Sequence, residues 1–389
     1  MKSAANDCGT AFVACSLLRI IGRHDFERPP LLCPNFIDHG FNPNPNWRFH
    51  PVLGWTQEPS KVYDIVIDGE SVRIEFNRMG FRDVDHTIPK PPDTRRIVVI
   101  GDSFSEAVQV NLGQIYFRRL EGLLNRESSQ RWEIINLGVG DFGTAQEWLA
   151  LQHYGYQFDP DFVILEVYPL NDICNNCIEL AGACRSQNDD YRPYFVPTGD
   201  GLRLTWTDPE RQWLRRHLVS FGLLEKAWLI GWDRFRKISP DELHRERYTA
   251  LGLPGDPLLL TFADDADQPP IVARGWRTTE SIIRNMDREL DAKGIRWMAF
   301  SIPFEWFVAD HWQAFSHSRR PIPLIRDYAE TRLDRLCAGL GAPFLALLPI
   351  FDQHPDVFFP SRGGHLNPPS HELVAEALLR KIEESGWTK

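Results

Sequence analysis

From residue 95 onward, short apolar runs alternate with longer stretches of helical periodicity, and this alternation constrains the fold more than any other feature. Strands separated by helices indicate a parallel sheet with helices on both faces. The first run, IVVI, is apolar throughout, as a strand buried on both faces should be. The predicted strands are residues 97–100, 132–136, 162–167, 295–302 and 343–347. The predicted helices are residues 105–125, 144–154, 274–293, 323–340 and 370–384. We therefore predict an α/β protein with three layers, α/β/α, around a central parallel sheet.

The first part of the chain is organised differently. Residues 63–67 and 72–76 alternate apolar with polar side chains on either side of an Asp-Gly turn, which is the pattern of a β-hairpin. A proline-rich stretch at residues 88–94 separates this hairpin from the strand–helix alternation. We predict a lead-in with a small β extension over residues 1–90 and the α/β domain over residues 91–389.

The strand–helix pattern breaks between about residues 185 and 270, which we interpret as an insertion in the α/β domain. A hairpin is expected around residues 198–201, where Thr-Gly-Asp-Gly supplies turn residues. The next segment carries Trp213, Trp228 and Trp232 among apolar residues at helical spacing. Such a stripe is typical of a helix packed on a core, and the alternative is a platform for a sugar or an acyl chain.

The charge and hydropathy of the chain exclude some classes of partner. The net charge is −10, from 43 basic and 53 acidic residues. This argues against a nucleic-acid partner, because a protein surface that binds nucleic acid needs clustered Lys and Arg. No stretch approaches the roughly 20 apolar residues of a transmembrane helix. Residues 12–21 are apolar but are interrupted by Arg19, so there is no clear signal peptide. The compartment, cytoplasmic or periplasmic/extracellular, stays open.

Three cysteines lie close together in the sequence. Cys174, Cys177 and Cys184 fall within eleven residues, and the other four are scattered. Free thiols and one local disulfide are both compatible with this spacing. A zinc site would need a fourth ligand that the neighbourhood does not supply.

Ser103 is the first residue that suggests chemistry. It ends a Gly-Asp-Ser tripeptide that directly follows the apolar strand, and a helix is expected next. Such a turn exposes the hydroxyl at the carboxyl edge of the sheet, where open α/β sheets bind ligands. The serine can cap the helix, or it can act as a nucleophile if a neutral imidazole takes its proton. His365, just ahead of the last predicted helix, is expected at the same edge.

Two further segments at this edge can stabilise negative charge. The turn after the second strand contains Gly138, Gly140 and Gly143, and its backbone N–H groups can bind the oxyanion that forms when a serine attacks a carbonyl. Asn171 follows the strand at residues 162–167, and its side-chain N–H can complete this oxyanion hole. The alternatives are ordinary turn glycines and an asparagine bonded to its own backbone. The common location of the segments favours acyl-transfer chemistry.

Together these segments resemble the SGNH hydrolase superfamily, also called the GDSL-like esterases. Its four blocks read here GDSFSEAVQV, NLGVGDFGTAQE, YPLNDI and GGHLNPPSHELVAEA, and the lead-in MGFRDVDHTIPKPPDTRRIVVIGDSF looks like a bacterial branch. The resemblance covers about residues 50–385. It implies a flavodoxin-like SGNH fold with no cofactor or metal, the nucleophile Ser103, the catalytic base His365 and the oxyanion amide Asn171.

The chain departs from the superfamily ahead of the histidine. The superfamily has an Asp two or three residues before the catalytic His, where this chain has Gly363 and Arg362. That Asp holds the imidazole in the right tautomer and stabilises its cation. A backbone carbonyl near Arg362, or another acid such as Asp352 or Asp356, is expected to replace it.

The second departure is in the glycine block. The oxyanion Gly of the superfamily aligns with Asp141, and Gly140 comes just before it. A carboxylate that pointed inward at Asp141 would oppose a developing oxyanion. The oxyanion donor is therefore expected to be the backbone N–H of Gly140 or of Asp141.

Three functions fit these observations. The leading hypothesis is a serine esterase or acylhydrolase that cleaves a small-molecule or carbohydrate O-acyl ester, such as an acetylated sugar, through an acyl-enzyme on Ser103. The second is an O-acyltransferase that passes the acyl group to a sugar or small-molecule hydroxyl. The third is a degenerate, non-catalytic protein that binds glycans or takes part in assembly. The sequence leaves the oligomeric state open.

Overall fold

A parallel sheet of five strands lies at the centre of the structure, a computed structural model that describes residues 47–184, 191–199, 201–207, 213, 240–316, 322–357 and 364–388. The strands are β5 (Thr94–Ile100), β6 (Arg131–Asn136), β7 (Phe162–Val167), β10 (Arg296–Ser301) and β11 (Phe344–Ala346). All neighbouring pairs are parallel, in the order β11-β10-β7-β5-β6. Counted along the chain this is the order 2-1-3-4-5, which is that of the flavodoxin-like doubly wound fold.

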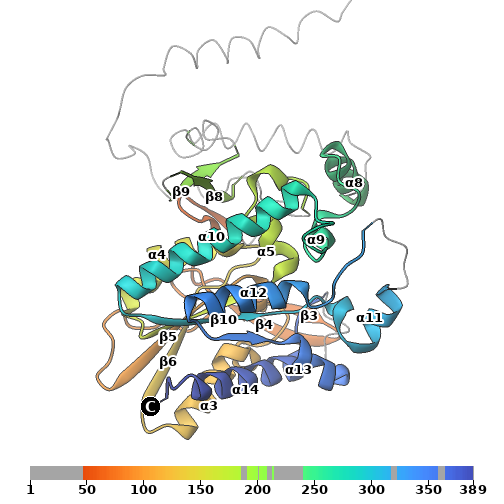
Figure 1. The fold of residues 1–389 in the computed structure, drawn as a ribbon. Helices are drawn as coiled ribbons and strands as arrows, with labels where there is room; N and C mark the ends of the chain where they lie inside the picture. Colours follow the sequence, from red (N-terminus) through yellow and green to blue (C-terminus); the bar gives the residue numbers. More distant parts are fainter. Residues whose placement is uncertain are drawn as a thin grey trace, which may run out of the picture. The chain divides into compact units, whose positions relative to one another are not determined.

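Helices cover both faces of this sheet (Figure 1). The helices α3 (Tyr116–Glu127) and α14 (Pro368–Glu384) pack together on one face. The other face is covered by α4 (Thr144–His153), α10 (Pro270–Ala292) and α12 (Tyr328–Leu340). Buried apolar side chains from the strands and from both helix layers form one continuous core. The predicted three-layer α/β/α class is therefore confirmed.

Short helices occupy many of the connections. They are α2 (Ser103–Glu106), α5 (Pro169–Asn175), α8 (Pro240–Ala250), α9 (Pro257–Leu260), α11 (Ala309–Ser316) and α13 (Leu348–Gln353). Single 3-10 turns are η2 (Leu112–Gln114), η3 (Gly155–Phe158), η4 (Ile178–Leu180), η5 (Glu305–Phe307) and η6 (Pro355–Val357). Within the described ranges, none of the helices combines the length and the apolar character that crossing a membrane requires.

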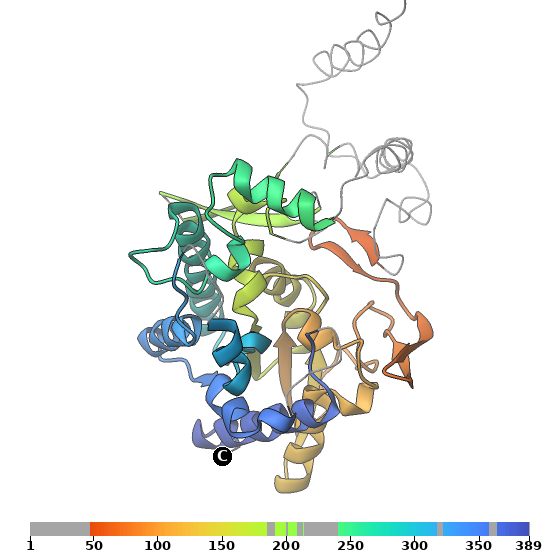
Figure 2. The same ribbon diagram turned by 90° about the vertical axis from the view of Figure 1, so that its right-hand side faces the viewer.

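Antiparallel hairpins accompany the sheet (Figure 2). They pair β1 (Trp47–His50) with β2 (Gly54–Gln57), β3 (Val62–Ile67) with β4 (Glu70–Glu75), and β8 (Pro193–Thr198) with β9 (Gly201–Trp206). The β3–β4 hairpin is the predicted one, and Asp68 and Gly69 at its turn both have positive φ, as the Asp-Gly pattern requires. The β8–β9 turn lies where a hairpin was expected, whereas β1–β2 was not predicted.

Two of the segments discussed from the sequence lie wholly or mostly outside the described ranges. The apolar stretch at residues 12–21 lies outside the described ranges. Of the tryptophan-bearing segment in the insertion, only Trp213 lies within them.

The single helix predicted over residues 105–125 is wrong, because the helical path is interrupted after α2. Ala107 has a left-handed conformation with φ 46°, and α3 begins only at Tyr116. The guanidinium of buried Arg82 donates to the carbonyls of Glu106, Ala107 and Val110. These carbonyls are thus satisfied by a side chain from the lead-in rather than by continued helical hydrogen bonds.

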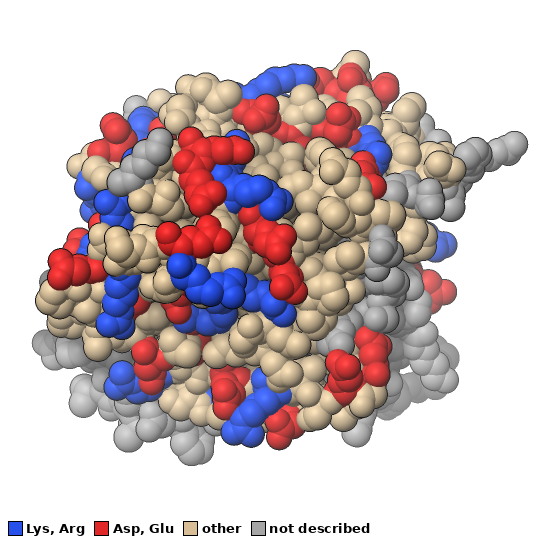
Figure 3. Space-filling model, turned by 90° about the horizontal axis from the view of Figure 1, so that it is seen from below, with Lys and Arg blue, Asp and Glu red and all other residues tan. Residues whose placement is uncertain are grey.

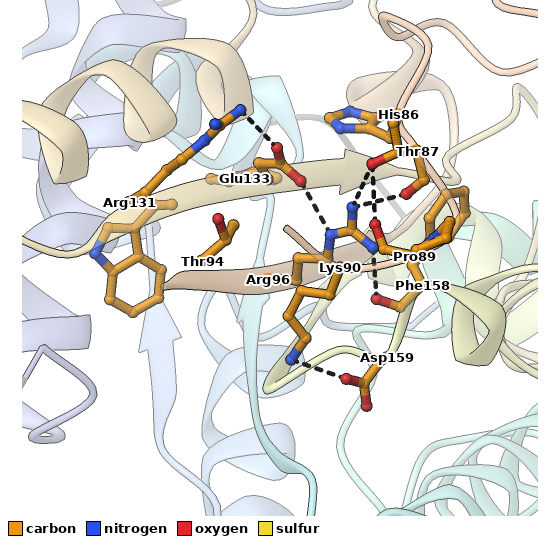
Figure 4. Close-up of polar contacts among 12 residues, drawn as sticks. His86, Thr87, Pro89, Lys90, Thr94, Arg96, Arg131, Glu133, Phe158 and Asp159 are labelled. Atoms are coloured by element: carbon orange, nitrogen blue, oxygen red, sulfur yellow. Dashed lines mark hydrogen bonds and ion pairs between the residues drawn. The ribbon is translucent and has the colours of Figure 1, made fainter. Parts of the chain in front are cut away.

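A second buried arginine joins the lead-in to the sheet, as Figure 4 shows. Arg96 of β5 is fully buried, and its Nε lies 3.0 Å from Glu133 Oε2 on β6. Its other nitrogens donate to the carbonyls of Thr87, Ile88 and Phe158. A buried charge is tolerated only when it is paired and hydrogen-bonded in this way. Arg96 thereby fixes the chain that precedes β5 against the sheet.

The face formed by α3 and α14 carries charges of both signs. Seen from below in Figure 3, basic and acidic side chains lie next to each other on this face. Ion pairs within and between the two helices include Arg118–Glu121, Arg119–Glu372 and Lys381–Glu384. Such a face lacks the single-sign field that attracts nucleic acid.

The three neighbouring cysteines form one disulfide and leave one free thiol. Cys174 is bonded to Cys184, while Cys177 is a buried free thiol. No group of three or more His, Cys, Asp or Glu side chains is arranged to hold a metal ion within the residues that were placed.

Candidate active site

The Ser103 hydroxyl lies at the carboxyl end of β5, on the first residue of α2. Asp102 caps this helix by accepting the N–H of Phe104 at 2.9 Å, and Asp102 itself is fully buried. With Asp102 as N-cap, only two residues separate the end of the strand from the start of the helix. The sharp turn leaves Ser103 partly exposed while its neighbours on both sides are buried.

His365 meets this serine from the other end of the chain. Its Nε2 lies 2.9 Å from Ser103 Oγ, which is hydrogen-bond distance. The imidazole also packs against the Phe104 ring, with 4.9 Å between ring centroids. The N-cap Asn367 accepts the N–H of Ser370 at 2.9 Å and so starts α14 directly after the histidine. Two residues 262 positions apart are therefore placed as nucleophile and base would be.

Asn171 lies beside the same turn, on α5 after β7. Its Nδ2 donates to Asp102 Oδ2 at 2.7 Å. An asparagine amide has two N–H donors, so this bond fixes the orientation of the amide and leaves a second donor. The structure thus brings Ser103, His365 and Asn171 together at one sheet edge.

The glycine turn after β6 differs from the expectation for Gly140. The Gly140 N–H donates to Glu106 Oε2 at 3.1 Å, and its carbonyl accepts the indole N–H of Trp55 at 3.1 Å. The Gly140 N–H is therefore directed at a buried carboxyl group of α2. Asp141, which follows, has a left-handed conformation with φ 64°.

The Asp141 carboxylate is paired with an arginine that the sequence analysis did not single out. Arg192, just before β8, has a fully buried side chain, and its NH2 lies 3.2 Å from Asp141 Oδ2. Its NH1 donates to the Asp141 carbonyl at 2.8 Å, and its guanidinium lies over the Trp55 ring. The Arg192 charge offsets the carboxylate that would otherwise oppose an oxyanion. No local pattern in the sequence marks this pair.

The candidates for the role of the superfamily Asp before His365 lie in different parts of the chain. Arg362 and Gly363 lie outside the described ranges, as does the side chain of Asp356. Asp352 forms an ion pair with Arg326. Glu305 is beside the histidine segment, because a Cβ at Gly364 would lie 3.5 Å from Glu305 Oε2.

A group of buried carboxyls beneath the turn is the main feature that sequence reasoning missed. It comprises Asp102, Glu106, Glu147, Glu166 and Asp172, none of which is more than 4% exposed. Burial raises the pKa of each of them, and it raises the pKa of Glu106 to about 7. The one available signal was Glu166, a carboxyl in the otherwise apolar strand FVILEV.

Comparison with solved structures gives alignments at low identity. The acetyl xylan esterase AlAXEase is 13% identical, with 74% of this chain and 99% of that chain covered and a TM-score of 0.39. The lipase/acylhydrolase from Enterococcus faecalis is 15% identical, with 75% and 96% covered and a TM-score of 0.38. TesA is 12% identical, with 75% and 99% covered and a TM-score of 0.37. No protein-family model matches the chain, and no curated protein matches it.

The strand order and the four motif blocks carry the assignment of the fold. The flavodoxin-like order 2-1-3-4-5 is the one that the resemblance implied, and the serine and histidine blocks meet at the carboxyl edge of the sheet. The chain therefore has an SGNH hydrolase-like fold.

Proposed function

We propose that this protein is a serine-dependent esterase that cleaves small O-acyl esters, such as an O-acetylated sugar. The observation that carries the proposal is the 2.9 Å contact between Ser103 Oγ and His365 Nε2 at the carboxyl edge of the sheet. A serine hydroxyl is a weak nucleophile until an adjacent base takes its proton, and this contact supplies the base.

The reaction would proceed through an acyl-enzyme. Ser103 Oγ attacks the ester carbonyl carbon while His365 Nε2 takes the hydroxyl proton. The bond from the carbonyl carbon to the alcohol oxygen then breaks, and His365 returns the proton to the departing alcohol. A water molecule, deprotonated by His365, then attacks the acyl-enzyme; the bond from the acyl carbon to Ser103 Oγ breaks, His365 returns the proton to Oγ, and the acid leaves.

Three donors are available to the oxyanion in this proposal. The Ser103 N–H and the second Nδ2 proton of Asn171 would donate to the developing charge. The backbone N–H of Asp141 is the third candidate, preferred over Gly140 because the Gly140 N–H donates to Glu106. The Asp141 carboxylate is held by Arg192, which limits its repulsion of the oxyanion.

The first test is covalent labelling with a fluorophosphonate, together with turnover of p-nitrophenyl acetate. Ser103→Ala should abolish labelling and lower turnover by about four orders of magnitude or more, and His365→Ala should lower turnover about as much, because members of a triad act as a unit. Ser281→Ala on α10 and His354→Ala after α13 are the matched controls, and both should behave as wild type. Labelling that persists in Ser103→Ala, or a folded wild type that is not labelled, would contradict the proposal.

A further inference from the structure

Glu166 is a buried acid directly beneath the nucleophile turn. It lies on β7, which pairs with β5, and its side chain is fully buried. The Glu166 carboxyl lies so close to the turn that a Cβ on Gly101 would be 2.4 Å from Glu166 Oε2. The absence of a side chain at Gly101 therefore makes room for this carboxyl.

The two oxygens of Glu166 have different surroundings. Oε2 accepts the hydroxyl of Ser105, whose Oγ in turn lies 2.6 Å from the hydroxyl of Tyr116. Among the described residues, no group donates a hydrogen bond to Oε1. Oε2 also comes close to the neighbouring residue of the turn, because Gly101 directly precedes Asp102, and the Asp102 and Glu166 carboxyls are within hydrogen-bonding reach of each other. Two carboxyls can share a hydrogen bond only when one of them carries a proton.

The hydrogen bonds indicate which carboxyl is charged. Asp102 accepts two N–H donors, from Phe104 at 2.9 Å and from Asn171 at 2.7 Å, whereas the one donor to Glu166 among the described residues is the Ser105 hydroxyl. Donors that point at a carboxyl favour its ionised form, so the negative charge belongs on Asp102. Burial raises the pKa of both groups, and the charge of Asp102 raises the pKa of Glu166 further.

We propose that Glu166 is a positioning residue that stays protonated and donates a hydrogen bond to Asp102. This bond holds Asp102 as the acceptor for Phe104 N–H and for Asn171 Nδ2, and thereby fixes both the serine turn and the oxyanion amide. The inference rests on the proposed esterase function. It assigns a role to a residue that touches neither the substrate nor Ser103.

Substitutions at the two carboxyls test this assignment. Glu166→Leu should lower kcat for p-nitrophenyl acetate by about 100-fold, the cost of a displaced oxyanion donor, with KM changed less than about threefold. Glu166→Gln should restore most of that rate, because a neutral amide can still donate to Asp102 and accept from Ser105. Asp102→Asn should not retain the rate in this way. The new amide would place an N–H donor at the position where Asn171 Nδ2 also donates. Activity retained in Asp102→Asn and lost in Glu166→Gln would overturn the proposal by placing the proton on Asp102.

Glu147→Leu is the matched control for the loss of a buried acid. Glu147 belongs to the same group of carboxyls and is fully buried, but neither of its oxygens has a hydrogen-bond partner among the described residues. Its replacement should leave kcat within about threefold of wild type. An equal loss in Glu147→Leu and Glu166→Leu would contradict a specific role for Glu166 and indicate a general packing effect.

Infrared spectroscopy tests the location of the proton without using activity. The wild-type minus Glu166→Gln difference spectrum should contain one carbonyl-stretch band of a protonated carboxyl, and this band should persist in the spectrum of Asp102→Asn. The reverse pattern would overturn the assignment even if Glu166→Leu failed to fold. A wild type that shows the band but is not labelled by fluorophosphonate would contradict the proposed function, while the bond from Glu166 to Asp102 would stand as a structural feature only.

Discussion

Gly138 lies where the turn after β6 approaches α2, and its lack of a side chain is a requirement of this contact. A Cβ there would lie 2.3 Å from the Cβ of Ser105. Gly138→Ala should therefore push α2 away and destabilise the fold by about 1–3 kcal/mol, with a parallel loss of any p-nitrophenyl acetate turnover. Gly122→Ala on α3 is the control, since nothing lies within 4 Å of its Cβ and alanine should raise stability by up to about 1 kcal/mol. Urea unfolding measures both, and equal effects of the two substitutions would contradict the argument.

The ion pair between Arg192 and Asp141 leads to a second prediction at the level of single residues. Arg192→Gln removes the cation that lies 3.2 Å from the Asp141 carboxylate, so the rate should fall at least about tenfold, which corresponds to about 1.4 kcal/mol in the barrier. Adding Asp141→Asn should restore much of the rate, because the negative charge that opposes the oxyanion is then removed. A double-mutant cycle on kcat with p-nitrophenyl acetate measures this coupling. Strictly additive losses would show that the carboxylate does not act on the reaction.

At the scale of elements, Glu330 ties α12 to two neighbours. It accepts the Ser301 hydroxyl at the end of β10 at 2.8 Å and the Leu348 N–H of α13 at 3.1 Å. Burial raises the pKa of Glu330 to about 7, above its ordinary value of 4.5. The folded state therefore binds more protons than the unfolded state between these values, and stability should fall as pH rises from about 4.5 to about 7.

The test of this pH dependence is Glu330→Gln, which keeps the acceptor oxygen and removes the titration. The variant should be more stable than wild type at pH 8, by up to about 3 kcal/mol, and not at pH 4. Urea unfolding at the two pH values measures the difference. A stability gain that is the same at both pH values would show that the ionisation of Glu330 does not oppose folding.

The elements that the sequence predicted well are those decided by local pattern. Residues 162–167 form β7 as expected, because a short apolar run between a turn and a helix has few alternatives. The break at Ala107 was not predictable, since it depends on Arg82, which lies 25 positions away along the chain. The same holds at the site. Ser103 follows from a motif at a strand end and His365 from a motif ahead of the last helix, whereas the roles inferred for Glu166 and Arg192 depend on contacts between segments far apart in the sequence.

At the scale of the whole molecule, the apolar interior is divided into a large core and smaller clusters. One small cluster contains Cys174, Cys177 and Cys184 with Leu180 and Val272, and it is separate from the core around the sheet. It packs where η4 and the start of α10 meet α5, the helix that carries Asn171. Cooperative units of this size can open without global unfolding. The disulfide between Cys174 and Cys184 closes a short loop across this cluster.

Removal of that disulfide should therefore loosen the small cluster and leave the large core intact. The cross-link spans 10 positions and is worth about 3 kcal/mol, so the double variant Cys174→Ala/Cys184→Ala should open locally about 100-fold more often. Cys177 reports this opening, because burial raises the pKa of its thiol to about 12 and the closed state resists alkylation. Cys337, buried in the large core, has a thiol pKa raised to about 12 as well and is the internal control. Iodoacetamide labelling read out by peptide mass should accelerate at Cys177 and not at Cys337, whereas equal acceleration at both would mean that the disulfide stabilises the molecule as one unit.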